Sequence, residues 1–227
     1  MMTKKRILFM LIPLLVLAVL FGILVIIISI PGNVYTNTSE ISDIIGSLQP
    51  RVIKLENITI KAQPDSTSCA ITTVTVASNY FNNANYEVSD LIEKYLSSKG
   101  SSSGGDMEEW LQQEMPERTI LFKSGVTTGE MIGDIHASLN NDNPVVIIFG
   151  APNPYNEPYY DFHASVVYGI NLDSETITIA NSYGYSEEIT LVDFLNKMSY
   201  TETNKYPFFQ KISVKFFQPK NAYYLIT

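Results

Sequence analysis

The sequence predicts an α+β domain behind one N-terminal transmembrane helix, and three observations support this prediction. An uncharged run occupies residues 7–30, segments of helical character fill most of residues 71–139, and segments of strand character follow residue 145. Helices grouped ahead of an antiparallel sheet are typical of the α+β class. At 227 residues with 45% hydrophobic side chains, the chain is long enough for one packed domain and too apolar to be disordered.

The uncharged run is expected to be a signal anchor. Its 24 residues would form a helix of roughly 36 Å, which exceeds the roughly 30 Å of a hydrocarbon core. The alternative is a cleaved signal peptide, but residues 29–32 (Ser-Ile-Pro-Gly) do not form a small-x-small site. The basic flank at residues 1–6 should stay in the cytoplasm. We therefore expect a single-pass protein of the cell membrane whose domain is extracytoplasmic.

Charge and composition exclude several classes of site. The chain beyond residue 30 holds 12 basic and 23 acidic residues, and an acidic domain with no basic stripe is not expected to bind nucleic acid. One cysteine excludes an intrachain disulfide. The only histidines are His136, which we interpret as structural, and His163. We expect neither a metal nor another cofactor, and the oligomeric state stays open.

The first half of the chain beyond the anchor should be mainly helical. Residues 31–50 are expected to form a stalk with one weak helical turn, and residues 51–227 the folded domain. Its first elements should be a strand at 52–60, helices at 71–81 and 88–96, a flexible loop at 97–105, a helix capped by Asp106, a strand at 119–122 and a helix at 129–139. The helix at 71–81 is rich in Thr and Val, so burial must stabilise it.

The second half should be mainly β. Apolar runs and alternating patterns predict strands at 145–149, 162–170, 176–180, 211–217 and 222–226, with a short helix at 191–198. Residues 151–161 hold three prolines and three tyrosines and are expected to form an ordered loop. Loops on a rigid scaffold commonly carry binding residues, so we expect this loop to contact a substrate.

The only cysteine, Cys69, stands at the predicted start of a helix. The unpaired N–H groups and the positive dipole end of a helix favour a thiolate there. A hairpin would bring His163, at the start of one strand, beside Asn181, at the end of the next. Gln63 lies six residues before Cys69. The pattern predicts a catalytic site formed by these four residues.

Each of the four residues has a chemical role in this hypothesis. Cys69 is the nucleophile, and His163 takes its proton and later gives it to the leaving amine. Asn181 holds the imidazole in one tautomer and orientation. The Gln63 amide and the Cys69 backbone N–H would stabilise an oxyanion. The alternative is structural for all four: a core thiol, a sheet histidine, a turn former and a strand-end residue.

These motifs resemble the papain-like cysteine peptidases, and among them the double-glycine, bacteriocin-processing group. The resemblance covers roughly residues 50–227 and rests on three features: Gln63 six residues before Cys69, the sequence His-Ala-Ser-Val-Val-Tyr-Gly from His163, and Asn-Ser-Tyr-Gly from Asn181. The last motif has the papain-type form, whereas the double-glycine group more often has Asp-Pro there. Ala70 stands where these enzymes often have glycine.

The resemblance implies a papain-like fold and a cysteine peptidase that cleaves a peptide or protein through a thioester acyl-enzyme. Two alternatives stay open. One is an acyl-transferring transpeptidase or cell-wall amidase with the same dyad. The other is a non-catalytic binding module that retains the fold.

Overall fold

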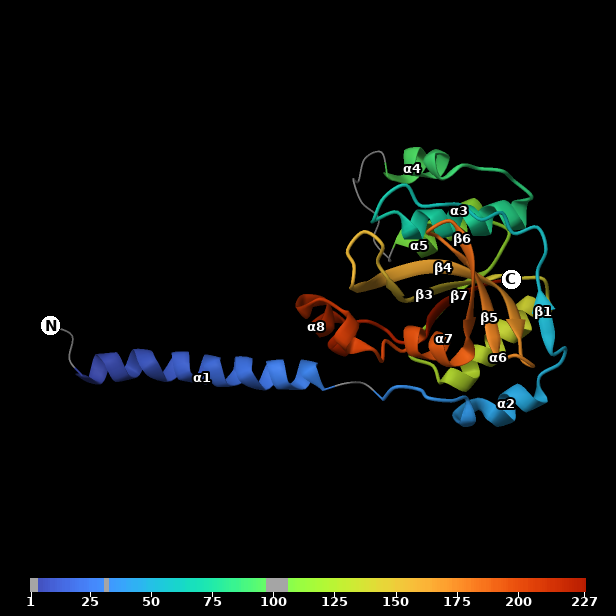
Figure 1. Ribbon diagram of the computed structural model, residues 1–227. Coiled ribbons are helices and arrows are strands. Elements are labelled where there is room, and N and C mark those ends of the chain that lie inside the picture. Colours follow the sequence, from blue (N-terminus) through green and yellow to red (C-terminus); the bar gives the residue numbers. More distant parts are fainter. Residues whose placement is uncertain (1–3, 31–32, 97–105) are drawn as a thin grey trace.

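The computed structural model describes residues 4–30, 33–96 and 106–227, with side chains from residue 13 onward. A long N-terminal helix, α1 (Lys4–Ser29), projects from the folded domain (Figure 1). No helix in the fully described part of the chain is both long enough and apolar enough to cross a membrane. The transmembrane span expected over residues 7–30 therefore stays a prediction. The flexible loop expected at 97–105 lies outside the described residues.

The domain has the predicted α+β architecture. Helices on one face of a central sheet are α3 (Cys69–Asn82), α4 (Val88–Leu96) and α5 (Asp106–Glu114). The opposite face is covered by α6 (Thr128–Asn140) and α7 (Leu191–Met198). The expected helices at 71–81, 88–96, 129–139 and 191–198 are all present, with ends within two residues of the predicted ones.

The sheet is antiparallel throughout, with the strand order β2-β7-β3-β4-β5-β6 and with β1 paired to β4. Its strands are β1 (Val52–Lys54), β2 (Ile120–Lys123), β3 (Val145–Pro152), β4 (Tyr160–Asn171), β5 (Thr176–Asn181), β6 (Tyr185–Thr190) and β7 (Ala222–Ile226). The long β4 lies at the centre, and its apolar run is buried on both sides because helices cover both faces of the sheet.

Helix α3 is stabilised by burial, as its composition requires. Ten of its residues, from Ala70 to Asn79, are buried. The hydroxyl groups of Thr72, Thr73 and Thr75 each donate to the backbone carbonyl four residues earlier, so these buried polar groups are satisfied. This central helix packs on β4 and so fixes the position of its first residue, Cys69.

Helix α8 and strand β6 differ in type from the sequence prediction. The strand expected at 211–217 is wrong, because these residues belong to helix α8 (Phe208–Phe216), which starts directly after Pro207. Ile212, Val214 and Phe216 alternate with polar residues, but Phe208, Ile212 and Phe216 also share a helical spacing of four. The edge strand β6 was not expected, because its largely exposed, polar sequence lacks an apolar face.

The segment before the domain contains more structure than the expected single turn. It forms a 3₁₀ turn, η1 (Ser39–Ile41), followed by α2 (Ser42–Ser47). Ile41 and Ile45 are buried in the main core, so this part of the expected stalk packs against the domain. The expected strand at 52–60 is confined to β1, and the expected loop at 151–161 is shorter because β3 and β4 extend into it.

Candidate active site

Cys69 is the first residue of α3 and is half-buried. The loop before it is ordered by the Asp65 carboxylate, which accepts hydrogen bonds from the Thr67 backbone N–H and from the hydroxyls of Thr67 and Ser68. Ser68, the residue before the helix, therefore makes no capping bond with its side chain to α3. The helix terminus presents the thiol toward β4, on which α3 packs.

The β4–β5 hairpin brings His163 and Asn181 together, as the sequence predicts. Asn181 pairs with Ser165 across the two strands. His163 Nε2 lies 2.9 Å from Asn181 Oδ1, and both side chains are buried. Because an amide oxygen can only accept, Nε2 carries the proton and donates it. The other ring nitrogen, Nδ1, is then the basic one in the neutral imidazole.

Asn181 is itself held by a carboxylate. Its Nδ2 donates to Glu187 Oε2 at 2.7 Å, and its Oδ1 also accepts from the Tyr183 backbone N–H at 3.0 Å. The Glu187 bond fixes which end of the amide faces His163. Glu187 lies on β6, the strand that sequence reasoning missed, and no motif in the sequence pointed to it.

Ser182 connects the histidine to Gln63. Its hydroxyl oxygen lies 3.0 Å from His163 Nε2, 2.8 Å from the Ala164 carbonyl oxygen and 3.3 Å from Gln63 Oε1. The residue is buried, so each of these contacts is shielded from water. It is part of the Asn-Ser-Tyr-Gly motif, but sequence analysis gave it no role.

Gln63 is buried beside the turn that follows β5. Its backbone N–H donates to the Ser182 carbonyl at 2.7 Å, and its side-chain Nε2 donates to the Asp65 carbonyl at 2.6 Å. An oxyanion role would use the other N–H of this amide. The close approach depends on Gly184, whose φ is +100° and where an added Cβ would lie 2.6 Å from the Ala62 Cβ.

Two tyrosines border the site. The Tyr183 ring stacks on the His163 ring with centroids 4.1 Å apart and an interplanar angle of 19°. Tyr155, at the tip of the loop between β3 and β4, packs edge-on against Tyr183 at 6.3 Å and is more than half exposed. The loop expected to contact substrate therefore reaches Tyr183, the ring that stacks on the imidazole.

Cys69 and His163 belong to the same site. The backbone N–H of Ala164, the residue after His163, donates a hydrogen bond to the Cys69 sulfur. Burial raises the pKa of Tyr183, the ring that stacks on the imidazole, and a Cys69 thiolate, once formed, raises it further. Sulfur, imidazole and carboxamide thus gather where α3, β4 and β5 meet.

A known protein family matches the part of the chain that contains these residues. The Peptidase C39-like family matches residues 55–208, which is more than half of the chain and includes all four predicted site residues. The chain belongs to this family. The membership confirms the resemblance to papain-like cysteine peptidases of the double-glycine type, and with it the papain-like α+β fold.

Solved structures to which this chain is similar include those of two bacterial peptidases. These are the peptidase domain of Streptococcus ComA (11% identity, 75% of this chain and 98% of that chain, TM-score 0.48) and a putative C39-like peptidase from Bacillus anthracis (12%, 78% and 98%, TM-score 0.46). A third is xylellain, a cysteine protease from Xylella fastidiosa (10%, 82% and 88%, TM-score 0.42). A comparison with curated proteins gives no match.

A groove of about 680 Å³ in this C39-like domain is lined by the chain neighbours of Gln63 and not by Gln63 itself. It lies between residues 61–64 and α4, and its lining includes Ala62, Pro64, Val88 and Ile92. Within the described residues, no group of His, Cys, Asp and Glu side chains is arranged to hold a metal ion.

Electrostatics at the C39-like site differ from the expectation for a helix terminus. Burial raises the pKa of the Cys69 thiol above its usual value, although the N–H groups of Ala164 and Ala70 act in the opposite direction. Burial also lowers the pKa of His163 to about 4, against the effect of its bond to Asn181. Both directions favour a neutral thiol and a neutral imidazole at neutral pH, opposite to the thiolate that the start of a helix favours.

The raised pKa of Cys69 and the lowered pKa of His163 predict how Cys69 reacts with iodoacetamide. Only the thiolate reacts, and a raised pKa keeps the proton on sulfur to higher pH than in an unfolded chain, whose thiol pKa is about 8.5. We expect the alkylation rate to rise through about pH 9 without a plateau at neutral pH. Mass spectrometry of the native chain against the chain in urea measures this for Cys69 alone, because the protein has no other cysteine. A rate that stays level down to about pH 5 would indicate a thiolate–imidazolium pair and contradict these pKa directions.

Proposed function

We propose that this protein is a membrane-anchored, extracytoplasmic cysteine peptidase that cleaves peptide bonds through Cys69, His163 and Asn181. One observation carries the proposal: the 2.9 Å bond from His163 Nε2 to Asn181 Oδ1 directs the basic Nδ1 away from the carboxamide, at a site that also holds the only thiol of the chain. A base oriented by a third group beside a nucleophile is the general arrangement of covalent acyl transfer.

The reaction uses a neutral pair at rest. As the Cys69 sulfur attacks the carbonyl carbon of the substrate, the thiol proton passes to His163 Nδ1, and the carbonyl oxygen becomes an oxyanion. The oxyanion is stabilised by the Cys69 backbone N–H and by the Gln63 amide. Collapse breaks the C–N bond, and His163 gives its proton to the leaving amine, which leaves a thioester on Cys69.

Water completes the cycle. His163 takes a proton from the water as it attacks the thioester carbonyl, and then returns a proton to the sulfur as the acid product leaves. Asn181 accepts the Nε2–H bond in every step, so the ring keeps one orientation. We propose the loop that carries Tyr155 and the groove between residues 61–64 and α4 as the surfaces that contact the peptide.

Anchoring by residues 7–30 is the second part of the proposal. It is supported by the 24-residue uncharged run and by the large apolar side chains of α1, several of which are more than half exposed, among them Leu14, Leu17 and Phe21. A basic flank before the run favours an N-terminus in the cytoplasm and a domain outside it.

Incubation of the full chain with a peptide library and, separately, with peptidoglycan tests the reaction class. We expect cleaved peptides and a transient mass increase on the tryptic peptide that contains Cys69, which is the acyl-enzyme. Released cell-wall fragments with the peptides intact would assign an amidase. Peptides joined to an added amine without hydrolysis would assign a transpeptidase. No turnover in either arm and no acylation would assign a binding module, and each of these three results overturns the peptidase proposal.

A further inference from the structure

The aromatic face of α8 is an unusual surface for an acidic domain. Four phenylalanines at the two ends of this helix are exposed, with exposed fractions of 40% for Phe208, 81% for Phe209, 50% for Phe216 and 77% for Phe217. At 3.6 residues per turn, Phe208, Phe209, Ile212 and Phe216 fall within about 100° of the helix surface. They form one outward apolar stripe, which we call the α8 stripe.

The inner side of α8 is held firmly to the domain. Val214 is buried in a small cluster with Tyr200 and Tyr206. Gln210 Nε2 donates to Asp161 Oδ1 at 3.0 Å, two residues before His163 in the chain. The α8 stripe is therefore exposed although α8 itself is packed firmly on the domain. The helix is also bonded directly to β4, the strand that carries the imidazole.

The charge around the α8 stripe is opposite to that of the whole protein. Residues 203–227 contain four lysines and no acidic residue, whereas the chain as a whole has a formal charge of −8. Lys205 is paired with Glu202. Lys211 and Lys215 lie on α8, and Lys220 lies four residues after its end. An apolar stripe with lysines along its edge is the pattern of helices that lie in the interface of anionic membranes.

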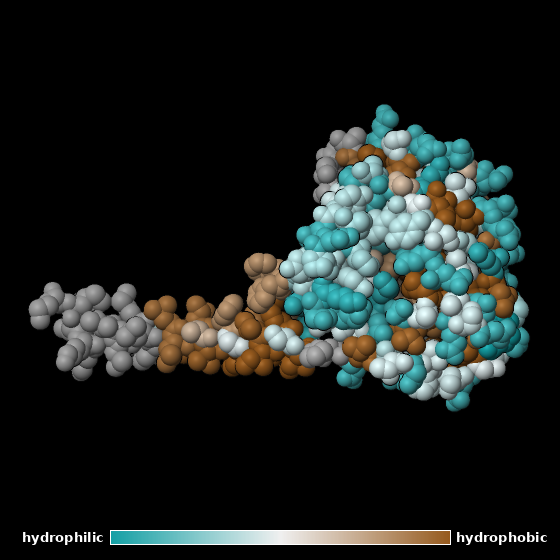
Figure 2. All heavy atoms as spheres, viewed as in Figure 1, coloured by the Kyte–Doolittle hydropathy of each residue, from teal (hydrophilic) through white to brown (hydrophobic). Residues whose placement is uncertain are grey.

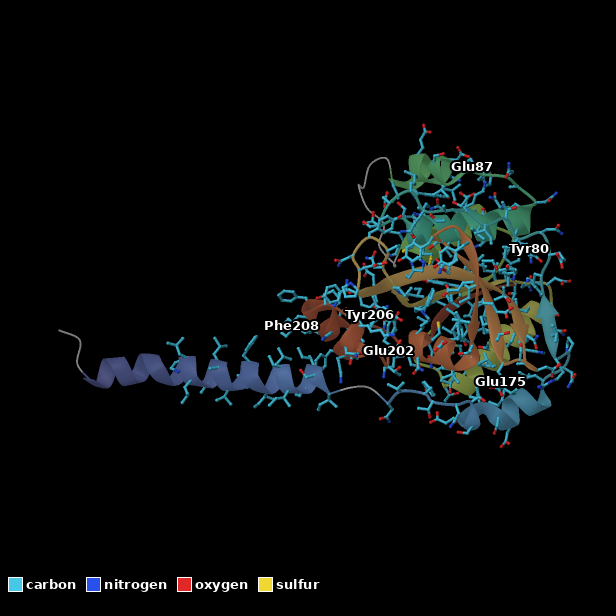
Figure 3. The ribbon with its side chains drawn as sticks, viewed as in Figure 1. Tyr80, Glu87, Glu175, Glu202, Tyr206 and Phe208 are labelled. Carbon is cyan, nitrogen blue, oxygen red and sulfur yellow. The ribbon has the colours of Figure 1, made fainter. Side chains whose placement is uncertain are left out.

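The α8 stripe also lies beside the end of α1. Lys215 Nζ hydrogen-bonds the Ile30 carbonyl, directly after α1, and the two helices are in contact. Figure 2 shows hydrophobic atoms gathered where α1 and α8 meet. In Figure 3, Phe208 lies on the side of the domain from which α1 projects, whereas Glu87 and Tyr80 lie far from it.

We infer that the α8 stripe docks on the bilayer surface and inserts its phenylalanines among anionic lipid headgroups. The inference rests on the proposed membrane anchoring by residues 7–30. A helix that enters the bilayer at Ile30 would bring α8 to the interface, where Phe side chains are removed from water and lysines meet lipid phosphates. Docking of α8 would fix the orientation of β4 and the active site relative to the membrane.

Tryptophan quenching by lipids tests the inference in the full chain. The probe is Phe208→Trp, and the matched control is Tyr86→Trp, because Tyr86 is 39% exposed and precedes Glu87 on the far part of the domain. The natural Trp110 is buried and gives a constant background. Both variants are reconstituted into phosphatidylcholine vesicles that contain phosphatidylglycerol, with and without bromine on the upper acyl chain.

We expect brominated lipid to reduce the emission of the Phe208→Trp probe by about twofold and to leave the Tyr86→Trp control unchanged. Removing phosphatidylglycerol, or combining the probe with Lys211→Gln and Lys220→Gln, should weaken the quenching. Equal quenching of probe and control, or none, would overturn the inference. A blue shift that grows with protein concentration in detergent, without quenching by lipid, would assign the stripe to a second copy of the chain and also overturn it.

Extraction of the same vesicles with alkaline carbonate tests the anchor at residues 7–30 independently of the docking of α8. A chain that resists extraction but shows no quenching at position 208 refutes the docking of α8 and leaves the anchor intact. A chain that is extracted by carbonate refutes the anchor, and quenching at position 208 before extraction then still reports whether α8 binds the lipid surface.

Discussion

Replacement of Cys69 by alanine is expected to lower kcat/KM for peptide cleavage by roughly four to six orders of magnitude. The covalent route is lost with the thiol, and only binding and oxyanion stabilisation remain. Stability should change little, because Cys69 is only half-buried and its side chain is small. The measurement is hydrolysis of a peptide identified from the library, with thermal unfolding of both proteins as the check on folding.

The two histidines of the chain provide a matched control for this prediction. His163→Gln should cause a loss as large as Cys69→Ala, since the general base is removed. His136 is also buried, but it lies on α6, outside the site. Its Nε2 is 2.8 Å from the Pro50 carbonyl oxygen. His136→Gln should therefore retain kcat/KM within about tenfold while it lowers the unfolding temperature. Equal activity in the Cys69→Ala variant and the natural protein would exclude a cysteine mechanism.

The sequence predicts the main helices and the central strands well, because their signals are local. The apolar run 145–149 could only be a buried strand or helix segment, and Thr127 marks the start of α6 by accepting from the Glu130 N–H. Residues 211–217 show where local patterns are insufficient. Their alternating pattern favours a strand, and their spacing of four favours a helix. Only the packing of Val214 against Tyr200 and Tyr206 selects the helix.

The part of the site whose chemistry follows directly from residue type could be predicted from the sequence. Histidine and asparagine at hairpin-compatible positions specified the central bond, which the structure gives as 2.9 Å. Ser182 and Glu187 were not predictable, because serine and glutamate are common on strands and turns and their roles arise only from tertiary contact. Glu187 also lies on the unexpected edge strand.

The resting charge of the site could not be predicted from the sequence either. The start of a helix favours a thiolate, and that argument is local. Burial under the strands favours the neutral thiol, and the extent of burial depends on the whole fold. The second effect is the larger one here, so the local argument gave the wrong sign.

The bond between Asn181 and Glu187 predicts the largest effect outside the reacting atoms. Asn181→Asp is conservative in shape, and aspartate would still accept the His163 Nε2–H. However, the substitution replaces the Nδ2 donor, 2.7 Å from Glu187 Oε2, by a carboxylate oxygen. Two carboxylates at this distance cannot both ionise easily, and one pKa must rise. We expect kcat to fall about 100-fold, because the pair either separates and displaces the imidazole or binds a shared proton.

The stability of the Asn181→Asp variant has a pH dependence whose sign follows from this pair. A carboxyl group whose pKa is raised by folding holds a proton that the unfolded chain releases near pH 4. The folded variant is therefore most stable, relative to the natural protein, below about pH 4, and it loses stability as the pH rises through the raised pKa. Thermal unfolding of both proteins between about pH 4 and pH 8 measures this difference.

Glu187→Gln added to Asn181→Asp should reverse both effects. The new amide can donate to the introduced carboxylate across the same gap, so the two-residue unit again contains one donor and one acceptor, with the direction of the bond inverted. The double variant should recover kcat to within about tenfold of the natural protein and should lose the pH-dependent difference in unfolding temperature. A double variant as impaired as the single one would mean that Glu187 does not orient Asn181, and that the carboxamide positions His163 through its bond to the Tyr183 backbone N–H alone.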